Sequence, residues 1–133
     1  MSGELFDGVP YEYAAVAPSG ATLFTAGACP LDRDGNVVGP GDHVVQARVA
    51  LENLETVLRR HGTSAERLVR TTIYVVGGQP DLVRVWDVIA AGLAPYRPPS
   101  TLVGVAVLGY RDQLVEIDAI AALPPHPVSV VAP

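Results

Sequence analysis

Two stretches of the chain have the hydrophobic spacing of amphipathic helices. The first runs from Asp42, a good N-cap, to Gly62, which suits a helix C-terminus, and its apolar positions are Ala47, Ala50, Leu51, Leu54 and Leu58. The second follows Pro80, which suits a first helical position, and ends near Gly92; its apolar positions are Leu82, Val85, Trp86, Ile89 and Leu93. The spacing predicts two helices, each with one buried face, and it favours a core anchor over a binding platform for Trp86.

Four further segments have the character of strands. Residues 13–17 and 23–26 flank the turn-forming Pro18-Ser19-Gly20 and predict a hairpin. Residues 68–76 are rich in β-branched side chains, after a short turn at 63–66 that resembles a capping box. Residues 101–108 and 114–122 are apolar runs around the loop 109–112, which predicts a second hairpin. The expected order is ββαβαββ.

The last strand alternates in character. Glu116 and Asp118 share one face with Leu114 and Ile120, while the residues between them are apolar. We therefore expect both helices to cover one face of the sheet and the other face, with its Tyr, Thr and carboxylates, to need a partner or solvent.

The composition indicates one α/β domain over residues 1–123, followed by a loose proline-rich tail at 124–133. The chain has 133 residues, of which 49% are hydrophobic and 17% charged, and this apolar balance suggests oligomerisation. A net charge of −5 counts against nucleic acid and anionic membranes as partners and favours a small molecule. Without a long apolar run or a leader-like start, we expect a cytoplasmic protein. Cys29 and the three histidines lack metal-ligand spacing, so no metal is expected.

Four separated segments carry a family resemblance. They read Tyr13-Ala14-Ala15-Val16, Thr25-Ala26-Gly27-Ala28-Cys29-Pro30-Leu31-Asp32, Val69-Arg70-Thr71-Thr72-Ile73-Tyr74-Val75 and Leu114-Val115-Glu116-Ile117-Asp118-Ala119-Ile120-Ala121. In order and spacing they resemble the Rid superfamily of reactive intermediate deaminases, also called YjgF-like or RidA-like.

The resemblance implies a chorismate-mutase-like α/β fold and a homotrimer with a central barrel and ligand pockets between subunits. The best-known members hydrolyse reactive imines or enamines without any cofactor. Their signature arginine pairs with the substrate carboxylate, and Ser100 stands in its place here. We therefore expect poor activity on free 2-imino acids and a bulkier or uncharged substrate.

The same resemblance gives roles to candidate site residues. Glu116 matches the carboxylate that activates water, and a structural ion pair is its alternative. Tyr13 matches a pocket tyrosine, or else packs in the first strand. Cys29 lies in a pocket-forming segment as a ligand contact or nucleophile, or is a small buried residue.

Three residues near the arginine's place have two interpretations each. Ser100 and Thr101 either donate hydroxyl groups to a neutral ligand or cap the start of a strand. Arg97 either replaces the missing cation, a role for which Arg111 is the other candidate, or is a solvated loop residue. His43 and His61 are expected at the surface.

Two functions of different classes follow. The first is a Rid-like enzyme acting on an imine, enamine or related activated carbonyl compound, with Glu116 and Tyr13 handling water or protons. The second is a non-catalytic trimeric protein that binds a metabolite or protein partner in the same clefts. Accelerated imine hydrolysis separates them.

Overall fold

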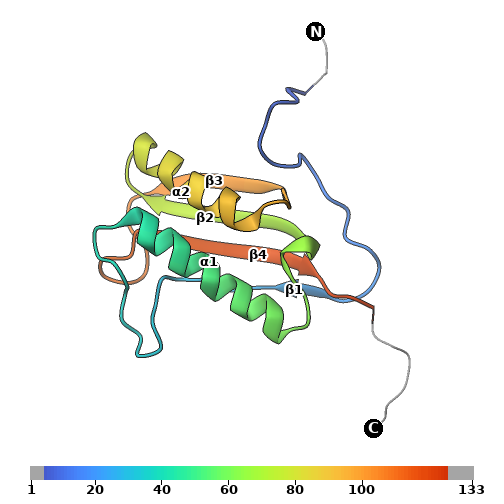
Figure 1. The fold of residues 1–133 in the computed structure, drawn as a ribbon, viewed down its shortest axis with the longest axis horizontal. Coiled ribbons are helices and arrows are strands. Elements are labelled where there is room, and N and C mark those ends of the chain that lie inside the picture. The colour runs from blue at the N-terminus through green and yellow to red at the C-terminus, as the bar shows by residue number, and fades with distance from the viewer. Residues whose placement is uncertain (1–4, 126–133) are drawn as a thin grey trace.

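Residues 5–125, which a computed structural model describes, form one mixed four-stranded sheet with two α-helices on one of its faces (Figure 1). In chain order the elements are β1 (Thr22–Phe24), α1 (His43–Arg60), the 3-10 turn η1 (Ala65–Arg67), β2 (Leu68–Val76), α2 (Gln79–Leu93), β3 (Ser100–Val105) and β4 (Val115–Ala122). The expected α/β class with two helices packed on a mixed sheet is therefore confirmed. None of the helices in this part of the chain is both long and apolar enough to cross a membrane.

The strand order in the sheet is β1-β4-β2-β3, so the expected hairpin of the last two strands is wrong. β3 runs parallel to β2, because α2 connects the two strands as a crossover helix does. β4 instead lies on the other side of β2 and is antiparallel to both β2 and β1. The loop between β3 and β4 passes the end of β2, which lies between these two strands. Glycine and polar residues are as common in such a loop as in a tight turn, so the composition did not distinguish the two.

The first expected strand, at residues 13–17, is also absent from the described sheet. These residues are exposed and pair with no strand, and β1 begins only at Thr22. Gly20 has the positive φ of +128° expected for the turn. The alanines and valine before it offer little cross-strand surface to hold a further strand against β1.

Local signals set both ends of α1. Asp42 Oδ1 accepts a hydrogen bond from the Val45 N–H at 3.0 Å, which is the N-cap predicted. Gly62, just past the helix, has a φ of +75°, which glycine adopts without strain. The capping box expected at 63–66 is wrong, because Ser64 makes no side-chain cap bond and the Thr63 hydroxyl donates to the Ala122 carbonyl at 2.8 Å.

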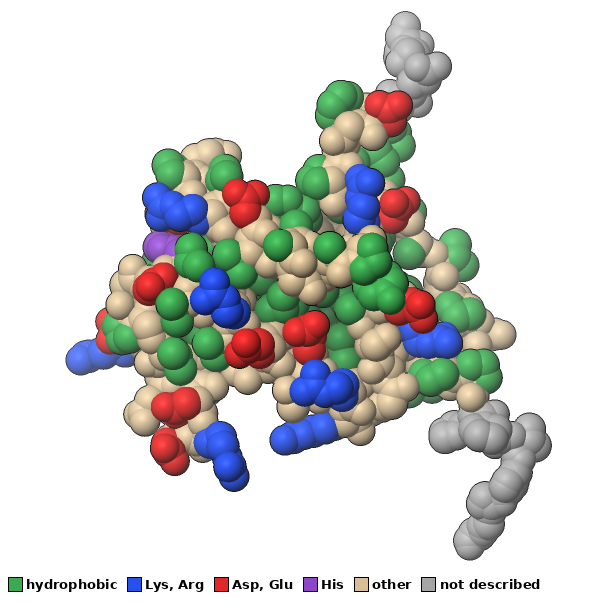
Figure 2. Space-filling view, viewed as in Figure 1, with side chains coloured by type: hydrophobic (Ala, Val, Ile, Leu, Met, Phe, Trp, Pro, Cys, Tyr) green, Lys and Arg blue, Asp and Glu red, His purple; other side chains and the backbone are tan. Residues whose placement is uncertain are grey.

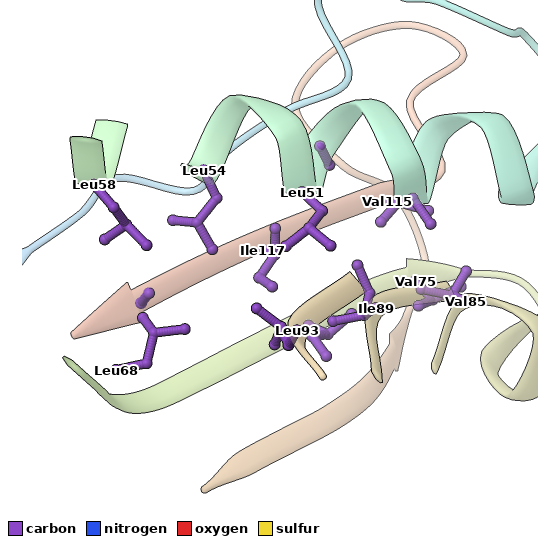
Figure 3. Packing of buried hydrophobic residues seen from close by; sticks show 14 of the residues in the cluster. Leu51, Leu54, Leu58, Leu68, Val75, Val85, Ile89, Leu93, Val115 and Ile117 are labelled. Atoms are coloured by element: carbon purple, nitrogen blue, oxygen red, sulfur yellow. The ribbon is translucent and has the colours of Figure 1, made fainter. Parts of the chain in front are cut away.

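The core lies between the two helices and the sheet (Figure 3). Leu51, Leu54 and Leu58 of α1 point toward β4, which contributes Val115 and Ile117 to the same cluster. Val85, Ile89 and Leu93 of α2 join the same buried cluster with residues of β2. The two apolar stripes predicted from the sequence are thus the faces that the fold buries, and Trp86 packs against this cluster while keeping part of its surface open.

His43 is not the surface residue that was expected. Its side chain is only 14% exposed, its Nε2 lies 2.7 Å from the Val76 carbonyl oxygen, and its Nδ1 lies 3.7 Å from Asp81 Oδ1. It therefore joins the start of α1 to the end of β2 and the first turn of α2. His61 is exposed, as expected. Of the predicted tail, residues 126–133 lie outside the described residues.

Candidate functional site

Glu116 lies on the sheet face opposite the helices, near the start of β4. The burial of β4 alternates along the strand, so Glu116, Asp118 and Ile120 share the open face as predicted. Across the sheet Glu116 is paired with Tyr74, and Asp118 with Thr72. The open face therefore carries two carboxylates beside a phenol and a hydroxyl.

Two side chains hold one oxygen of the Glu116 carboxylate. Glu116 Oε1 accepts hydrogen bonds from Gln113 Nε2 at 3.2 Å and from Cys29 Sγ at 3.5 Å. Gln113 is buried, donates also to the Val115 carbonyl, and accepts from the Tyr110 N–H, so its amide has a fixed orientation. Gln113 was not among the site residues predicted from the sequence, although a glutamine shortly before a buried strand is an available signal.

The second carboxylate oxygen of Glu116 lies against the backbone of Gly27. A Cβ built on residue 27 would overlap Glu116 Oε2 and crowd its carboxyl carbon, so a larger residue here would displace the carboxylate from this position. Gly27 belongs to the segment before Cys29, which pairs with β4 through Ala28 and Ile117. Oε2 of Glu116 therefore lies beside the main chain of Gly27, whereas Gln113 and Cys29 both donate to Oε1.

Cys29 supports Glu116 and has the environment of a protonated thiol. Burial and, second, the nearby Glu116 carboxylate raise the pKa of the Cys29 thiol. A thiol with a raised pKa is a weak nucleophile at neutral pH, since the thiolate is the reactive form. This geometry favours a hydrogen-bond donor over the nucleophile that was one alternative.

A second polar group occupies the neighbouring part of the open face. The Tyr74 hydroxyl donates to Asp118 Oδ2 at 2.9 Å, and this hydrogen bond is the main reason that the pKa of Tyr74 is raised. Arg70 donates to the Thr101 hydroxyl at 3.1 Å. Thr101 is therefore tied to β2.

Ser100 lies at the start of β3 with its hydroxyl fully engaged. Its Oγ donates to the Pro98 carbonyl at 3.0 Å and lies 2.5 Å from the Thr71 hydroxyl, which then acts as the donor in that pair. A hydroxyl has one proton, so Ser100 keeps none for a ligand in this arrangement. This geometry is compatible with capping of the strand start, and a role of Ser100 in ligand binding stays a prediction.

Arg97 and Tyr13 both contact the N-terminal segment. The Arg97 guanidinium donates to the Val9 carbonyl, and the Arg97 carbonyl accepts from the Glu12 N–H at 2.9 Å. The Tyr13 hydroxyl donates to the Phe6 carbonyl at 2.6 Å. The two Arg97 bonds hold the N-terminal segment along the connection between α2 and β3, and the Tyr13 bond closes that segment on itself.

The predicted site residues thus fall into two groups within one chain. Glu116 and Cys29 meet on the open face of the sheet, whereas Ser100, Thr101 and Arg97 surround cavities at the start of β3. Neither Glu116 nor Tyr13 lines the two cavities that Ser100 lines. That Glu116, Tyr13 and Ser100 line one pocket, formed between neighbouring subunits, stays a prediction. Among residues 5–125 no group of three or more His, Cys, Asp or Glu side chains could hold a metal ion.

The fold and this polar cluster define a class: a small α/β protein with a carboxylate site on the open face of its sheet. The family described as Endoribonuclease L-PSP matches residues 8–123. Protein DfrA of Myxococcus xanthus is 36% identical over 112 residues, covering 84% of each chain. Since the family match spans most of the chain, the protein belongs to this family, the Rid superfamily expected from the sequence.

Solved structures of the family agree with the fold. A Rid family protein of Yersinia pestis, YyfB, superposes with a TM-score of 0.77 at 30% identity, over 86% of this chain and 87% of that one. E. coli TdcF, solved with bound serine, superposes with a TM-score of 0.70 at 26% identity, over 87% of this chain and 90% of that one. The two-helix, mixed-sheet architecture is therefore the architecture of the family.

Proposed function

We propose that this protein hydrolyses an imine, enamine or related activated carbonyl compound, with Glu116 as the group that activates water. The observation that carries the proposal is the held carboxylate. Oε1 of Glu116 is fixed by Gln113 and Cys29, while Oε2 lies beside Gly27 with no side chain between. A general base needs this kind of fixed orientation toward the proton that it takes.

In the proposed reaction, water adds to the imine carbon and Glu116 takes one of its protons. Glu116 passes that proton to the imine nitrogen, which gives the carbinolamine. When the C–N bond breaks, Glu116 transfers the proton of the new hydroxyl group to the leaving nitrogen, so the ammonia carries both protons of the water. The carbonyl product keeps the oxygen of the water. An enamine enters the same sequence after its carbon takes up a proton to give the imine. No oxidant, reductant or cofactor enters this balance.

The pocket in this proposal is completed by a neighbouring subunit in a homotrimer. The open sheet face carries Glu116 and Asp118 together with the hydrophobic Val103 and Ile120, and Phe24 on the adjacent strand is 71% exposed. Such a mixed face in a small domain is stabilised by a symmetric partner. Sedimentation should give a trimer, and a monomer at micromolar concentration would contradict the proposed pocket.

The proposal also assigns weak activity on free 2-imino acids. Ser100 stands where the family resemblance places the carboxylate-binding arginine, and its hydroxyl is engaged with Pro98 and Thr71. Losing a charge-assisted hydrogen bond costs about 1.5–3 kcal/mol, which corresponds to roughly ten- to a hundredfold in binding or rate. Arg97 lines the same cavity as Ser100 and is the candidate for a substitute cation, although it donates to the Val9 carbonyl.

The experiment measures ammonia release from dehydratase-generated imines of alanine and 2-aminobutyrate and from neutral imines. We expect neutral imines to be hydrolysed faster, Glu116→Gln to lose the activity and Asp118→Asn to keep it. Ser100→Arg should raise activity on the imino acids. Parent activity on imino acids equal to that of an arginine-bearing family member, lost in Arg97→Ala, would overturn the assigned preference.

A non-catalytic role in metabolite binding is the second candidate, and the engaged Ser100 hydroxyl favours it. Absence of hydrolysis with every imine, together with saturable ligand binding, would establish it. Cleavage of RNA, which the family description mentions, has little electrostatic support in this chain. The net charge is −5, and acidic and basic side chains are interspersed over the helix-bearing face (Figure 2). The cytoplasm remains the predicted compartment.

A further inference from the structure

An apolar cavity of about 480 Å³ lies between the N-terminal segment and the C-terminal half of α2. A second cavity of about 470 Å³ adjoins it, and the two share Pro10, Trp86 and Ser100 in their walls. Volumes of this size are typical of small-molecule sites. The two cavities therefore form one candidate binding region around Trp86 and Ser100.

The wall of this region is aromatic. The Trp86 and Tyr11 rings meet edge to face, with centroids 6.2 Å apart and an interplanar angle of 87°. Tyr13 lies outside both cavity walls and packs edge to face on Tyr11, with ring centroids 6.0 Å apart. Trp86 packs against the core and is fixed in place, yet it lines both cavities. A rigid indole face offers a planar ring a specific contact beyond burial alone.

The polar groups in the same walls are already engaged. The Ser100 hydroxyl is bonded to Pro98 and Thr71. Arg97 is the charged side chain among the residues that line the two cavities, and it donates to the Val9 carbonyl. A carboxylate bound here would lose its hydration, and the cation available to it, Arg97, already donates to the Val9 carbonyl. A neutral ring has little hydration free energy to lose.

We propose that Trp86, Tyr11 and the space beside Ser100 bind an uncharged, planar aromatic group of the substrate. The inference deepens the proposed function by naming its substrate class, and it rests on that function for the reaction but not for the binding. The short Ser100 side chain leaves room for the ring where an arginine would fill the space.

The test uses Trp86 as its own reporter, because it is the one tryptophan of the sequence. Tryptophan fluorescence of the full-length protein is titrated with benzamide, with benzoate, which has the same ring and a negative charge, and with cyclohexanecarboxamide, which is neutral but not planar. We expect benzamide to bind saturably and the other two compounds to bind more weakly by about tenfold or more. For benzoate the reason is the cost of burying an unpaired charge, and a tenfold weaker Kd corresponds to about 1.4 kcal/mol.

A matched pair of variants locates the binding. Ala90 lines the first cavity, whereas its neighbour Ala91 is exposed on another side of α2. Ala90→Leu should abolish benzamide binding and Ala91→Leu should keep it. Ser100→Arg fills the same space with a cation and should reverse the preference toward benzoate, which keeps the test valid if Ala90→Leu does not fold.

Two results would overturn the inference. One is benzoate binding at least as tightly as benzamide to the parent protein, with loss in Arg97→Ala. The other is benzamide binding that Ala90→Leu and Ser100→Arg both leave unchanged. Imine hydrolysis measured on the same samples separates the two proposals. Hydrolysis without benzamide binding overturns this inference alone, and benzamide binding without hydrolysis upholds it while overturning the enzymatic function.

Discussion

Gln46 is a fully buried polar side chain in α1, and its replacement should cost several kilocalories per mole. Its Nε2 donates to the Gly39 carbonyl at 3.1 Å and to the Asp112 carbonyl at 2.9 Å, and its Oε1 accepts from the Leu114 N–H at 2.7 Å. Gln46→Met keeps the length and nearly the volume of the side chain, so it removes these bonds without a large cavity. At about 0.5–1.5 kcal/mol for each bond, the loss is roughly 1.5–4.5 kcal/mol.

Urea denaturation measures this loss, with parent and variant at equal protein concentration because assembly stabilises folded subunits by mass action. For a chain of this size about 3 kcal/mol corresponds to a fall in Tm of roughly 10 °C. Gln79→Met, at the exposed first residue of α2, is the matched control and should stay within about 0.5 kcal/mol. Hydrogen exchange of the Leu114 amide should accelerate in Gln46→Met. A free energy of unfolding equal to that of Gln79→Met, with Leu114 still protected, would refute the reasoning.

Three further outcomes are expected. Leu54→Ala, at a fully buried position, should lower the free energy of unfolding by about 2–5 kcal/mol, and little change in the urea midpoint would contradict the assigned helix face. Asp42→Ala removes the N-cap of α1 and should cost about 0.5–2 kcal/mol in the same assay, with Asp42→Asn close to the parent as control. Glu116→Gln should lower the pKa of the Cys29 thiol, because it removes a carboxylate charge that raises it, so alkylation by iodoacetamide should be faster at any pH below that pKa. Asp118→Asn should leave that rate unchanged, and an unchanged rate in Glu116→Gln would contradict the coupling.

The raised pKa of Cys29 also gives a sign for the pH dependence of stability. The folded state binds the thiol proton more tightly than the unfolded state does, so this contribution is present below the unfolded pKa and is lost as pH rises through the folded pKa. The loss therefore falls on the alkaline side, and Glu116→Gln should reduce it.

The sequence by itself determined the elements whose signals are local. The spacing of Leu51, Leu54 and Leu58 defines one face of a helix, and Asp42 and Gly62 mark its ends through their own backbone preferences. Alternation placed Glu116 and Asp118 on one face of β4 whatever the neighbouring strands are. The family followed from the order and spacing of four segments.

Only the tertiary structure decided which elements are neighbours. The loop between the last two strands has the composition of a turn, but α2 brings β3 parallel to β2 and leaves β4 on the other side. Gln113 and Cys29 are far apart in the chain and meet at Glu116 only because the segment before α1 pairs with β4. Residue type and spacing report local backbone preference and burial, whereas a hydrogen bond between distant residues depends on how the elements pack, and for that reason the surroundings of Glu116, Ser100 and Trp86 could not be predicted from the sequence.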